Sequence, residues 1–343
     1  MRSQFRIAVI GAGRAGMVHA INASRLVPLA ELSCIVDANS EVADKVGAEL
    51  GVPAFTDLEQ AVTETAFDGV VITTPTFTHA ELAVRAAAAG KHIFCEKPMA
   101  LTLQECDDMS LVAAKAGVVF QVGFVRHFQP EFVEAKHRIE AGEIGRPMVV
   151  KSLTRGPGLP PPWAHDLRRS NGMLAEVNSH DFDCTRWLVG SDIERVYAET
   201  ANFKGEERMV TAPDFYDNAV VTLRFASGAL GTIDGTCPAD YGYDARVEVL
   251  GTEGLLVVGQ NQATPLLEIR ARGVGEVPTY NSWPQRFEPG YRAELASFVE
   301  AALTGSAPEV GGADGRAALA AVRAANRSWL EGRPVLVATE GLS

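Results

Sequence analysis

The 343-residue sequence lacks several features that would place it in a special class of protein. No apolar run approaches the roughly 18 residues of a membrane-spanning helix. Lysine and arginine form no run and the formal net charge is −12, which argues against nucleic acid as the main partner. An apolar run typical of a strand begins at residue 6, so we expect no signal peptide ahead of it.

Cysteine is also scarce. The chain has five cysteines, an odd number, and none forms a C-x-x-C pair, so a structural zinc site is not expected. Most of them lie among apolar residues, which is typical of buried free thiols in a reducing compartment. We therefore expect a cytoplasmic protein, with its thiols at Cys34, Cys95, Cys106, Cys184 and Cys237.

The first part of the chain alternates short apolar runs with helical patterns. The length suggests about two domains. Continuous β-branched runs separated by amphipathic helices predict a parallel sheet that is covered on both faces, and so a doubly wound α/β domain at 1–125. The predicted strands are 6–10, 32–36, 69–73, 91–95 and 118–122, and the predicted helices are about 14–25, 40–50, 57–64, 78–89 and 102–116.

After residue 125 the pattern changes to helices followed by a series of strands with short turns. This pattern predicts an α+β domain at 126–343 with a mainly antiparallel sheet. Two closing helices, within about 290–331, can pack back on the first domain. The predicted strands are 147–154, 193–200, 218–226, 229–237, 242–250 and 254–258, and the proline-rich loop GPGLPPP lies at 156–162.

Residues 11–16, GAGRAG, form a complete G-x-G-x-x-G directly after a strand and at the start of a helix. Gly11 permits the tight turn, Gly13 lets the backbone approach a pyrophosphate, and Gly16 allows close helix–strand packing. The helix N-terminus, with Arg14 and Ala15, then offers free N–H groups to the phosphates. This context predicts a dinucleotide site.

An acid follows the second strand, as the dinucleotide motif requires. Asp37 lies about 20 residues beyond Gly16 and would bind the ribose hydroxyls of the adenosine. It would also repel a 2′-phosphate, and Ala38, Asn39 and Ser40 supply no arginine to neutralise one. We therefore expect NAD rather than NADP. The alternative is that Asp37 is a turn residue in a domain that binds nothing.

Several segments together resemble the Gfo/Idh/MocA family of oxidoreductases, closest in appearance to its inositol and sugar dehydrogenase branch. The resemblance runs through most of the chain, in family order. The segments are GAGRAG, TTPTFTHAELA (73–83), EKP (96–98), QVGFVRHFQP (121–130), AGEIGRP (141–147), HDFDCTRWL (180–188), YGYDARVEVLGTEG (241–254), WPQRF, YRAELASF and EGRPV (331–335).

The resemblance implies a fold and a chemistry. The fold would be an N-terminal Rossmann domain followed by a domain with a large open sheet, which commonly forms homodimers or homotetramers in the family. The chemistry would be metal-independent hydride transfer between NAD and a secondary alcohol of a polyol or sugar substrate.

Lys97 is the first candidate for catalysis. It follows a central strand at the end where α/β domains bind ligands, and a buried lysine can have its pKa lowered enough to exchange a proton. Glu96 would contact the cofactor or pair with Lys97; a surface salt bridge is the plain alternative. In family members the segment with Thr73, Thr74 and Pro75 lies along the cofactor. His79 would face the cofactor region or act as a capping or packing residue.

The second half of the predicted site is the segment MLAEVNSHDFDCTRWL at 173–188. Glu176, His180 and Asp183 are spaced by four and three, so on one helix they would share a face. Such a set could bind zinc or manganese, but no H-E-x-x-H supports it and Lys97 would add a cation.

The resemblance instead implies that His180 accepts the proton of the substrate hydroxyl or positions it, with Asp183 and Glu176 as substrate contacts. Histidine suits this role because its ordinary pKa is near neutrality. The family pattern has aspartate at the position of Glu176 and glycine at that of Asn178, so both residues are departures.

Six further residues are weaker substrate candidates. The family commonly has two arginines after the last Rossmann strand, so the histidine at 127 is another departure. The tyrosines of YGYD would alternate on a strand and share one face. The tryptophan of the proline-rich loop would stack on a sugar or simply pack. These candidates are Arg126, His127, Arg155, Trp163, Tyr241 and Tyr243.

The sequence leaves three functions open. The leading one is an NAD-dependent dehydrogenase of an inositol-like polyol. The second acts on a glycoside, sugar acid or anhydrosugar. The third is a regulator that binds nucleotide without turnover, which the presence of both Lys97 and His180 disfavours.

Overall fold

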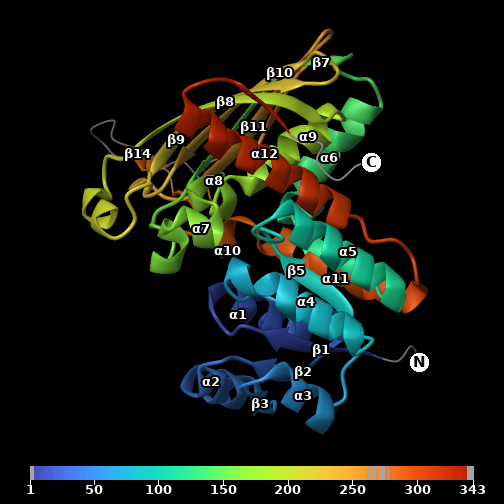
Figure 1. Ribbon diagram of the computed structural model, residues 1–343. Helices are drawn as coiled ribbons and strands as arrows, with labels where there is room; N and C mark the ends of the chain where they lie inside the picture. The colour runs from blue at the N-terminus through green and yellow to red at the C-terminus, as the bar shows by residue number, and fades with distance from the viewer. Residues whose placement is uncertain (1–3, 261–262, 264–267, 270–274, 277, 338–343) are drawn as a thin grey trace. The chain divides into compact units, whose positions relative to one another are not determined.

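The computed structural model of the chain describes residues 4–260, 263, 268–269, 275–276 and 278–337. Contacts divide the chain into two compact units, each built on one large sheet (Figure 1). The first unit contains residues up to 129 together with 289–319, and the second contains 130–288 together with 320–339. No helix in the described part of the chain is both long and apolar enough to cross a bilayer.

The first unit contains a six-stranded sheet in which all neighbouring strands are parallel. The strand order is β3-β2-β1-β4-β5-β6, so the order reverses between β1 and β4, where open α/β sheets bind ligands. The strands are β1 (Phe5–Ile10), β2 (Ala30–Val36), β3 (Ala54–Phe55), β4 (Gly69–Ile72), β5 (His92–Glu96) and β6 (Phe120–Gly123).

Alternate residues of these strands enter two separate cores. Ala8 and Ile10 of β1 belong to one core, together with residues of α3, α4 and α5, whereas Ile7 and Val9 belong to the other, with residues of α1, α2 and α11. The sheet is therefore covered on both faces, and the predicted doubly wound Rossmann class is confirmed. The helices of this unit are α1 (Arg14–Ile21), α2 (Ser40–Leu50), α3 (Leu58–Glu64), α4 (His79–Ala88), α5 (Leu103–Ala116), α11 (Glu288–Thr304) and the first part of α12 (Gly312–Glu331).

The second unit contains a seven-stranded sheet of order β12-β11-β7-β10-β9-β8-β15. All of its pairs are antiparallel except β7 with β10, so the expectation of a mainly antiparallel sheet is confirmed. Glu268–Ile269 (β13) and Gly275–Glu276 (β14) form a separate two-stranded sheet. The strands of the large sheet are β7 (Pro147–Arg155), β8 (Ile193–Ala201), β9 (Asn218–Phe225), β10 (Leu230–Thr236), β11 (Asp244–Gly251), β12 (Leu255–Val258) and β15 (Val335–Leu336).

The two faces of the large sheet differ. One face carries buried residues such as Val150 and Ile233 and contacts α9, whereas the other exposes Val220, Leu230 and Val257. This alternation of buried and exposed residues is that of a sheet covered on one face. The helices of this unit are α6 (Pro130–Glu140), α7 (Leu167–Ser170), α8 (Gly172–Glu176), α9 (Ser179–Val189), α10 (Trp283–Arg286) and the remainder of α12.

Candidate functional site

The glycine-rich turn joins β1 to α1 in the first unit. Gly11 has a φ of +94°, and a Cβ there would lie 2.9 Å from the backbone of Thr73. A Cβ on Gly16 would lie 1.9 Å from the carbonyl oxygen of Gly11, so both positions require glycine. Gly13 instead has no atom within 4 Å of a Cβ, and it precedes Arg14 and Ala15 at the start of α1 without a side-chain cap. The turn therefore leaves an open, uncapped helix N-terminus that fits a pyrophosphate.

Asp37 stands at the end of β2 and holds this turn. Its Oδ2 accepts a hydrogen bond from the Ala12 amide at 2.8 Å, and its Oδ1 accepts one from the Asn39 amide at 2.9 Å. The carboxylate remains half-exposed beside the turn. Its position fits the role predicted for it, and the two bonds show that it also supports the loop.

Thr73, Thr74 and Pro75 follow β4, next to the glycine-rich turn. The Thr73 hydroxyl donates to the carbonyl oxygens of Ile10 and Gly11, at 3.0 and 2.7 Å. His79 is buried, and its ring nitrogens lie 2.8 Å from the Thr74 carbonyl oxygen and 2.9 Å from that of Pro98. Burial lowers the pKa of His79 despite these contacts. His79 therefore connects the loops that follow β4 and β5, which agrees with the packing alternative for this residue.

Glu96 is the last residue of β5, and Lys97 follows it. Glu96 Oε1 lies 2.8 Å from Nε2 of His19, and Oε2 accepts a hydrogen bond of 3.1 Å from the Lys97 amide. The described residues therefore place Lys97 at the carboxyl edge of the sheet, as predicted. They pair Glu96 with a buried histidine of α1, a partner that the sequence did not suggest.

Arg126 and His127 lie in a 3₁₀ turn, Val125–Phe128, after β6. Both side chains are buried, and Arg126 is among the largest fully buried side chains of the chain. A buried guanidinium is uncommon, because charge is expensive to remove from water. Their assignment to the substrate stays a prediction.

The helix that was expected to carry Glu176, His180 and Asp183 is interrupted. Helix α8 ends at Glu176 and α9 begins at Ser179, so the prediction of three residues on one continuous helical face is wrong. Asn178 leaves the regular helical geometry, with a ψ of 0°. His180 and Asp183 still share one face of α9 and are buried, whereas Glu176 is half-buried on the preceding turn.

A buried polar network explains the interruption. The Asn178 side-chain amide donates to Asp181 Oδ2 at 2.8 Å, and the Ser152 hydroxyl of β7 donates to Asp181 Oδ1 at 2.5 Å. Asparagine favours such local bonds over the helical ones. A Cβ on Gly235 of β10 would lie 2.2 Å from Asn178 Oδ1. The asparagine therefore fits against the sheet only because β10 has a glycine there.

Arg155 and Tyr241 lie on the opposite face of the large sheet from α9. Ser152 and Thr154 are buried on the α9 side, whereas Arg155 alternates to the outer face and pairs with Asp234 of β10. This hydrogen bond to Asp234 raises the pKa of Arg155. Its guanidinium also donates to the Tyr241 hydroxyl at 3.4 Å. The structure thus does not bring Arg155 and Tyr241 together with His180.

The prediction that Tyr241 and Tyr243 alternate on a strand is wrong. Strand β11 begins only at Asp244, because Gly242 has a φ of +115° and breaks the extended run. Tyr241 is 44% exposed, whereas Tyr243 is 7% exposed and its ring edge packs against Phe287. The two rings therefore have different surroundings.

The proline-rich loop ends in a short 3₁₀ turn, Pro162–His165, that contains Trp163. His165 is anchored there: its Nε2 lies 2.9 Å from the Pro160 carbonyl oxygen and its ring lies 4.7 Å from that of Phe215. Burial lowers the pKa of His165. Trp163 is half-buried, so both roles considered for it remain predictions.

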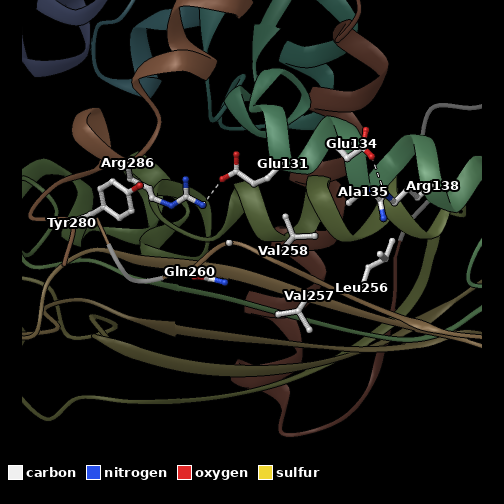
Figure 2. Close-up of a pocket in the computed structure, with 11 residues that line it drawn as sticks. Glu131, Glu134, Ala135, Arg138, Leu256, Val257, Val258, Gln260, Tyr280 and Arg286 are labelled. Atoms are coloured by element: carbon white, nitrogen blue, oxygen red, sulfur yellow. Dashed lines mark hydrogen bonds and ion pairs between the residues drawn. The ribbon is translucent and has the colours of Figure 1, made fainter. Parts of the chain in front are cut away.

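A pocket of about 430 Å³ lies in the second unit (Figure 2). It is bounded by α6 and by the edge strand β12. Its cations are already engaged, because Arg286 pairs with Glu131 at 2.6 Å and Arg138 with Glu134 at 2.7 Å. No predicted site residue lines it, so it carries no argument for catalysis.

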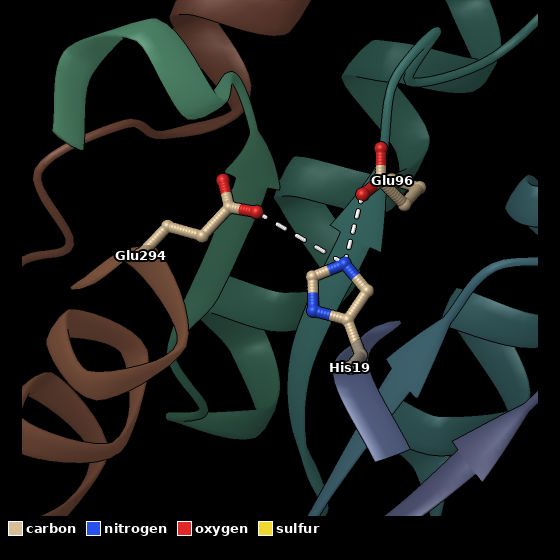
Figure 3. A group of neighbouring side chains, drawn as sticks. All are labelled: His19, Glu96 and Glu294. Atoms are coloured by element: carbon tan, nitrogen blue, oxygen red, sulfur yellow. Dashed lines mark hydrogen bonds and ion pairs between the residues drawn. The ribbon is translucent and has the colours of Figure 1, made fainter. Parts of the chain in front are cut away.

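The described residues also bring together three side chains of the kind that bind metals, and they are not the set considered from the sequence. His19, Glu96 and Glu294 are all buried, and their ligand atoms lie within 4.8 Å of one another (Figure 3). His19 and Glu294 were missed by sequence reasoning. The signal was present, since Glu294 interrupts the apolar series Tyr291, Leu295 and Phe298 on one face of α11.

Family models match both parts of the chain. A model described as an oxidoreductase family with an NAD-binding Rossmann fold matches residues 5–124, and the GFO/IDH/MocA C-terminal domain matches residues 132–257. The matches confirm the predicted NAD-binding domain.

Named relatives are similar along nearly the whole chain. The scyllo-inositol 2-dehydrogenase (NAD(+)) of Bacillus subtilis is 36% identical over 98% of this chain and 97% of its own. The myo-inositol 2-dehydrogenase of Thermotoga maritima is 36% identical over 96% and 98%. A crystal structure of Lactobacillus casei scyllo-inositol dehydrogenase with bound NAD(H) and scyllo-inositol superposes with a TM-score of 0.90, at 25% identity over 98% of this chain and 100% of the other.

Proposed function

The chain belongs to the Gfo/Idh/MocA family of oxidoreductases, and from this premise we propose that it is an NAD-dependent dehydrogenase of a cyclic, inositol-like polyol. The observation that carries the proposal is the near full-length similarity to relatives that are named inositol 2-dehydrogenases. The chain has Lys97 and His180 at the positions where the family motifs place the proton-handling residues.

The first unit has the groups that NAD needs. The open helix N-terminus at Gly13 would take the pyrophosphate, and Asp37 at the end of β2 would take the ribose hydroxyls. The residues after β4 and β5, from Thr73 to Pro75 and at Glu96 and Lys97, would lie along the rest of the cofactor. When bound, the nicotinamide supplies the acceptor for the hydride.

The reaction removes a hydride and a proton from one CH–OH group and leaves a ketone. We assign the proton to the imidazole of His180, and the Lys97 ammonium binds the same oxygen and stabilises the negative charge that develops on it. Burial of His180 supports this role, because a buried imidazole is held in one orientation and has little competition from water. The ketone reduction is the same sequence of steps in reverse.

Substrate binding is assigned to polar residues around His180. Asp183 is buried on the same face of α9, and Glu176 is half-buried just before the helix break. Carboxylates suit a polyol because each can accept hydrogen bonds from two hydroxyls. Arg126, His127 and Trp163 remain further candidates for this role.

A second candidate substrate class is a glycoside, sugar acid or anhydrosugar. The observation that favours it is the polar network of Asn178, Asp181 and Ser152, in which Asn178 replaces a glycine of the family pattern, and which interrupts the helix next to Glu176. Two departures from the family thus fall on the segment that we propose for substrate binding.

We also propose a homodimer or homotetramer that uses the uncovered face of the large sheet. That face exposes apolar side chains on several neighbouring strands: Val220, Leu230, Leu250, Leu255 and Val257. Leu230, Leu250 and Leu255 lie in register across the sheet on either side of Val149, whereas Val220 lies opposite Asp234. Exposed apolar side chains that lie together are typical of an interaction surface. Light scattering should show more than one chain per particle, and Val220→Glu with Val257→Glu should dissociate it; a monomeric wild type contradicts the proposal.

A substrate screen tests the function. Purified protein is mixed with NAD and with inositols, aldoses, glycosides or sugar acids, and NADH formation is followed by absorbance. We expect inositols to give the highest kcat/KM. Higher values for a glycoside or sugar acid favour the second class. Binding of NAD without turnover of any polyol or sugar favours a regulator and contradicts the proposal.

A further inference from the structure

Three buried side chains from distant parts of the first unit meet behind Lys97. His19 comes from α1, Glu96 from the end of β5, and Glu294 from α11 (Figure 3). Their side chains are 0%, 9% and 0% exposed. Ionisable groups are rarely so buried unless they have a role that an apolar residue cannot fill.

Glu96 is the central member, because each of its oxygens has a different partner. His19 Nε2 lies 2.8 Å from Oε1, and Oε2 accepts the hydrogen bond of the Lys97 amide at 3.1 Å. A Cβ on Gly123 of β6 would lie 3.2 Å from the Glu96 carboxyl carbon, so the glycine makes room for this conformation. Glu96 thus connects a helix to the backbone of the proposed catalytic lysine.

Glu294 completes the group without a hydrogen bond of its own. Neither of its carboxyl oxygens has a hydrogen-bond partner, and Oε1 lies 4.0 Å from His19 Nε2. Burial, and then the negative charge of Glu96, raise the pKa of Glu294 well above its usual range. The buried Glu294 carboxyl therefore favours its protonated form more strongly than an exposed glutamate does.

Other titratable groups surround Glu96 and feel its charge. Burial raises the pKa of Cys95, with a further contribution from Glu96, and the charge of Glu96 partly offsets the lowering of the His79 pKa by burial. The rings of Phe94 and Tyr291 lie 4.9 and 5.7 Å from that of His19. The buried Gln121 donates to the Glu294 backbone carbonyl at 2.9 Å. Because the group is removed from water, the hydrogen bonds of Glu96 are electrostatically stronger than at the surface.

We infer that His19, Glu96 and Glu294 form a buried positioning network that fixes the backbone of Lys97 for the reaction. His19 holds Glu96 Oε1, and Oε2 in turn holds the Lys97 amide. Glu294, which favours its protonated form, packs beside His19 as the third member of the group. This inference rests on the proposed function only for its effect on turnover, since the hydrogen bonds exist in the free protein.

The first test measures the Lys97 amide directly. Hydrogen–deuterium exchange of the segment 92–101 is compared for wild type, Glu96→Gln and His19→Leu. Both variants lose one link of the chain from His19 to the amide, so we expect roughly tenfold faster exchange at Lys97. His19→Gln can still donate to Glu96 and should restore most of the protection.

The matched control is His92→Gln. His92 lies at the other end of the same strand and accepts a hydrogen bond from the Val119 amide at 3.1 Å. The His92→Gln variant should show the same exchange at Lys97 and the same turnover as wild type. Equal acceleration in His92→Gln and His19→Leu would show general loosening of β5 and overturn the inference.

Kinetics and pH add a second test. Glu96→Gln should lower kcat roughly 100-fold with little change in KM, because a misplaced catalytic group affects the transition state more than binding. The basic limb of the kcat profile should also move to lower pH, because the Lys97 ammonium loses a nearby negative charge that favours its protonated form. A change confined to KM contradicts a positioning role.

Glu294→Gln separates charge from packing. Because the folded protein holds the Glu294 proton more tightly than the unfolded chain, wild-type stability falls as pH rises through the raised pKa. Glu294→Gln cannot ionise, so its Tm should vary less over the same range. An identical pH dependence in both proteins rejects the role given to Glu294.

The outcomes distinguish this inference from the proposed function. If wild type oxidises no polyol but Glu96→Gln accelerates exchange, the function fails and the network stands. If turnover is normal and exchange is unchanged in both variants, the network fails and the function stands. Zinc or manganese bound stoichiometrically by wild type and lost in His19→Leu would make the three residues a metal site and overturn the inference.

Discussion

The two units differ in how closely they follow the family pattern. In the first unit every position expected of a dinucleotide site is filled, from the glycine-rich turn to Asp37 and Lys97. In the second unit the segment before and within α9 departs at Glu176 and Asn178, and the helix is broken there. The residues proposed to hold NAD thus follow the family pattern, whereas two departures lie in the segment that we propose for substrate binding.

The comparison also shows how each unit keeps its polar groups in place. The first unit fixes the Lys97 backbone through Glu96 and His19. The second unit fixes the start of α9 through Asn178, Asp181 and Ser152. In each unit one carboxylate, Glu96 or Asp181, connects two elements without a proposed part in the reaction itself. Supporting residues of this kind determine how rigidly the reacting groups are held.

The largest effects should come from Lys97 and His180, the two residues that we propose act on the reacting oxygen. Lys97→Ala and His180→Ala should each lower kcat about 10²- to 10⁴-fold, because each removes a group that acts on the reacting oxygen. Binding of NAD, measured by calorimetry, should change little in His180→Ala. Turnover near the wild-type level in both variants would refute the site assignment.

The fold of the first unit could be predicted because its pattern is local. Each strand is a short apolar run, each helix is amphipathic, and the turn at GAGRAG has a steric reason at Gly11 and at Gly16. The Rossmann class and the family resemblance follow from those segments. The two-residue strands, β3 (Ala54–Phe55) and β15 (Val335–Leu336), were not predicted, because pairing with a neighbour rather than local pattern defines them.

The site could be predicted only in part, because its details depend on contacts between distant residues. The break before α9 depends on Ser152 and Gly235, which lie on other strands. The partner of Glu96 is His19, far away in sequence. The error at Tyr241 and Tyr243 was avoidable, since Gly242 between them is a turn signal.

Cofactor preference tests the dinucleotide site of the first unit, which follows the family pattern. Replacing Asp37 by Ser and Ala38 by Arg removes the charge that repels a 2′-phosphate and adds one that binds it. We expect the ratio of kcat/KM for NADP over NAD to rise about 100-fold, since like charges in contact cost several kcal/mol. Ser40→Ala is the control and should leave the ratio unchanged. A wild type that already prefers NADP would show that Asp37 was misread.

In the second unit, the packing of Asn178 against β10 tests our explanation of the helix break before α9. Gly235→Ala places a methyl group 2.2 Å from Asn178 Oδ1, so we expect a loss of about 1–3 kcal/mol in the free energy of unfolding. Asn178→Gly removes the obstacle, and the double variant should recover most of what the alanine alone costs. Urea unfolding of the four proteins measures the coupling; additive losses would mean that the two residues do not interact.

Glu176 offers the most sensitive comparison between this protein and its family. Glu176→Asp restores the family residue and shortens the side chain by one methylene, while the helix break set by Asn178 remains. One methylene in a binding site is worth about 1–3 kcal/mol of discrimination, so kcat/KM should shift roughly tenfold between inositols and the preferred substrate of the wild type. Because the carboxylate is retained, kcat for the better substrate should fall less than in Glu176→Ala.

If the shift appears only when Asn178→Gly is added, the helix break rather than the length of the side chain at position 176 sets substrate choice. If neither variant changes the ranking of substrates, selectivity is set elsewhere, with Arg126, His127 and Trp163 as the next positions to change.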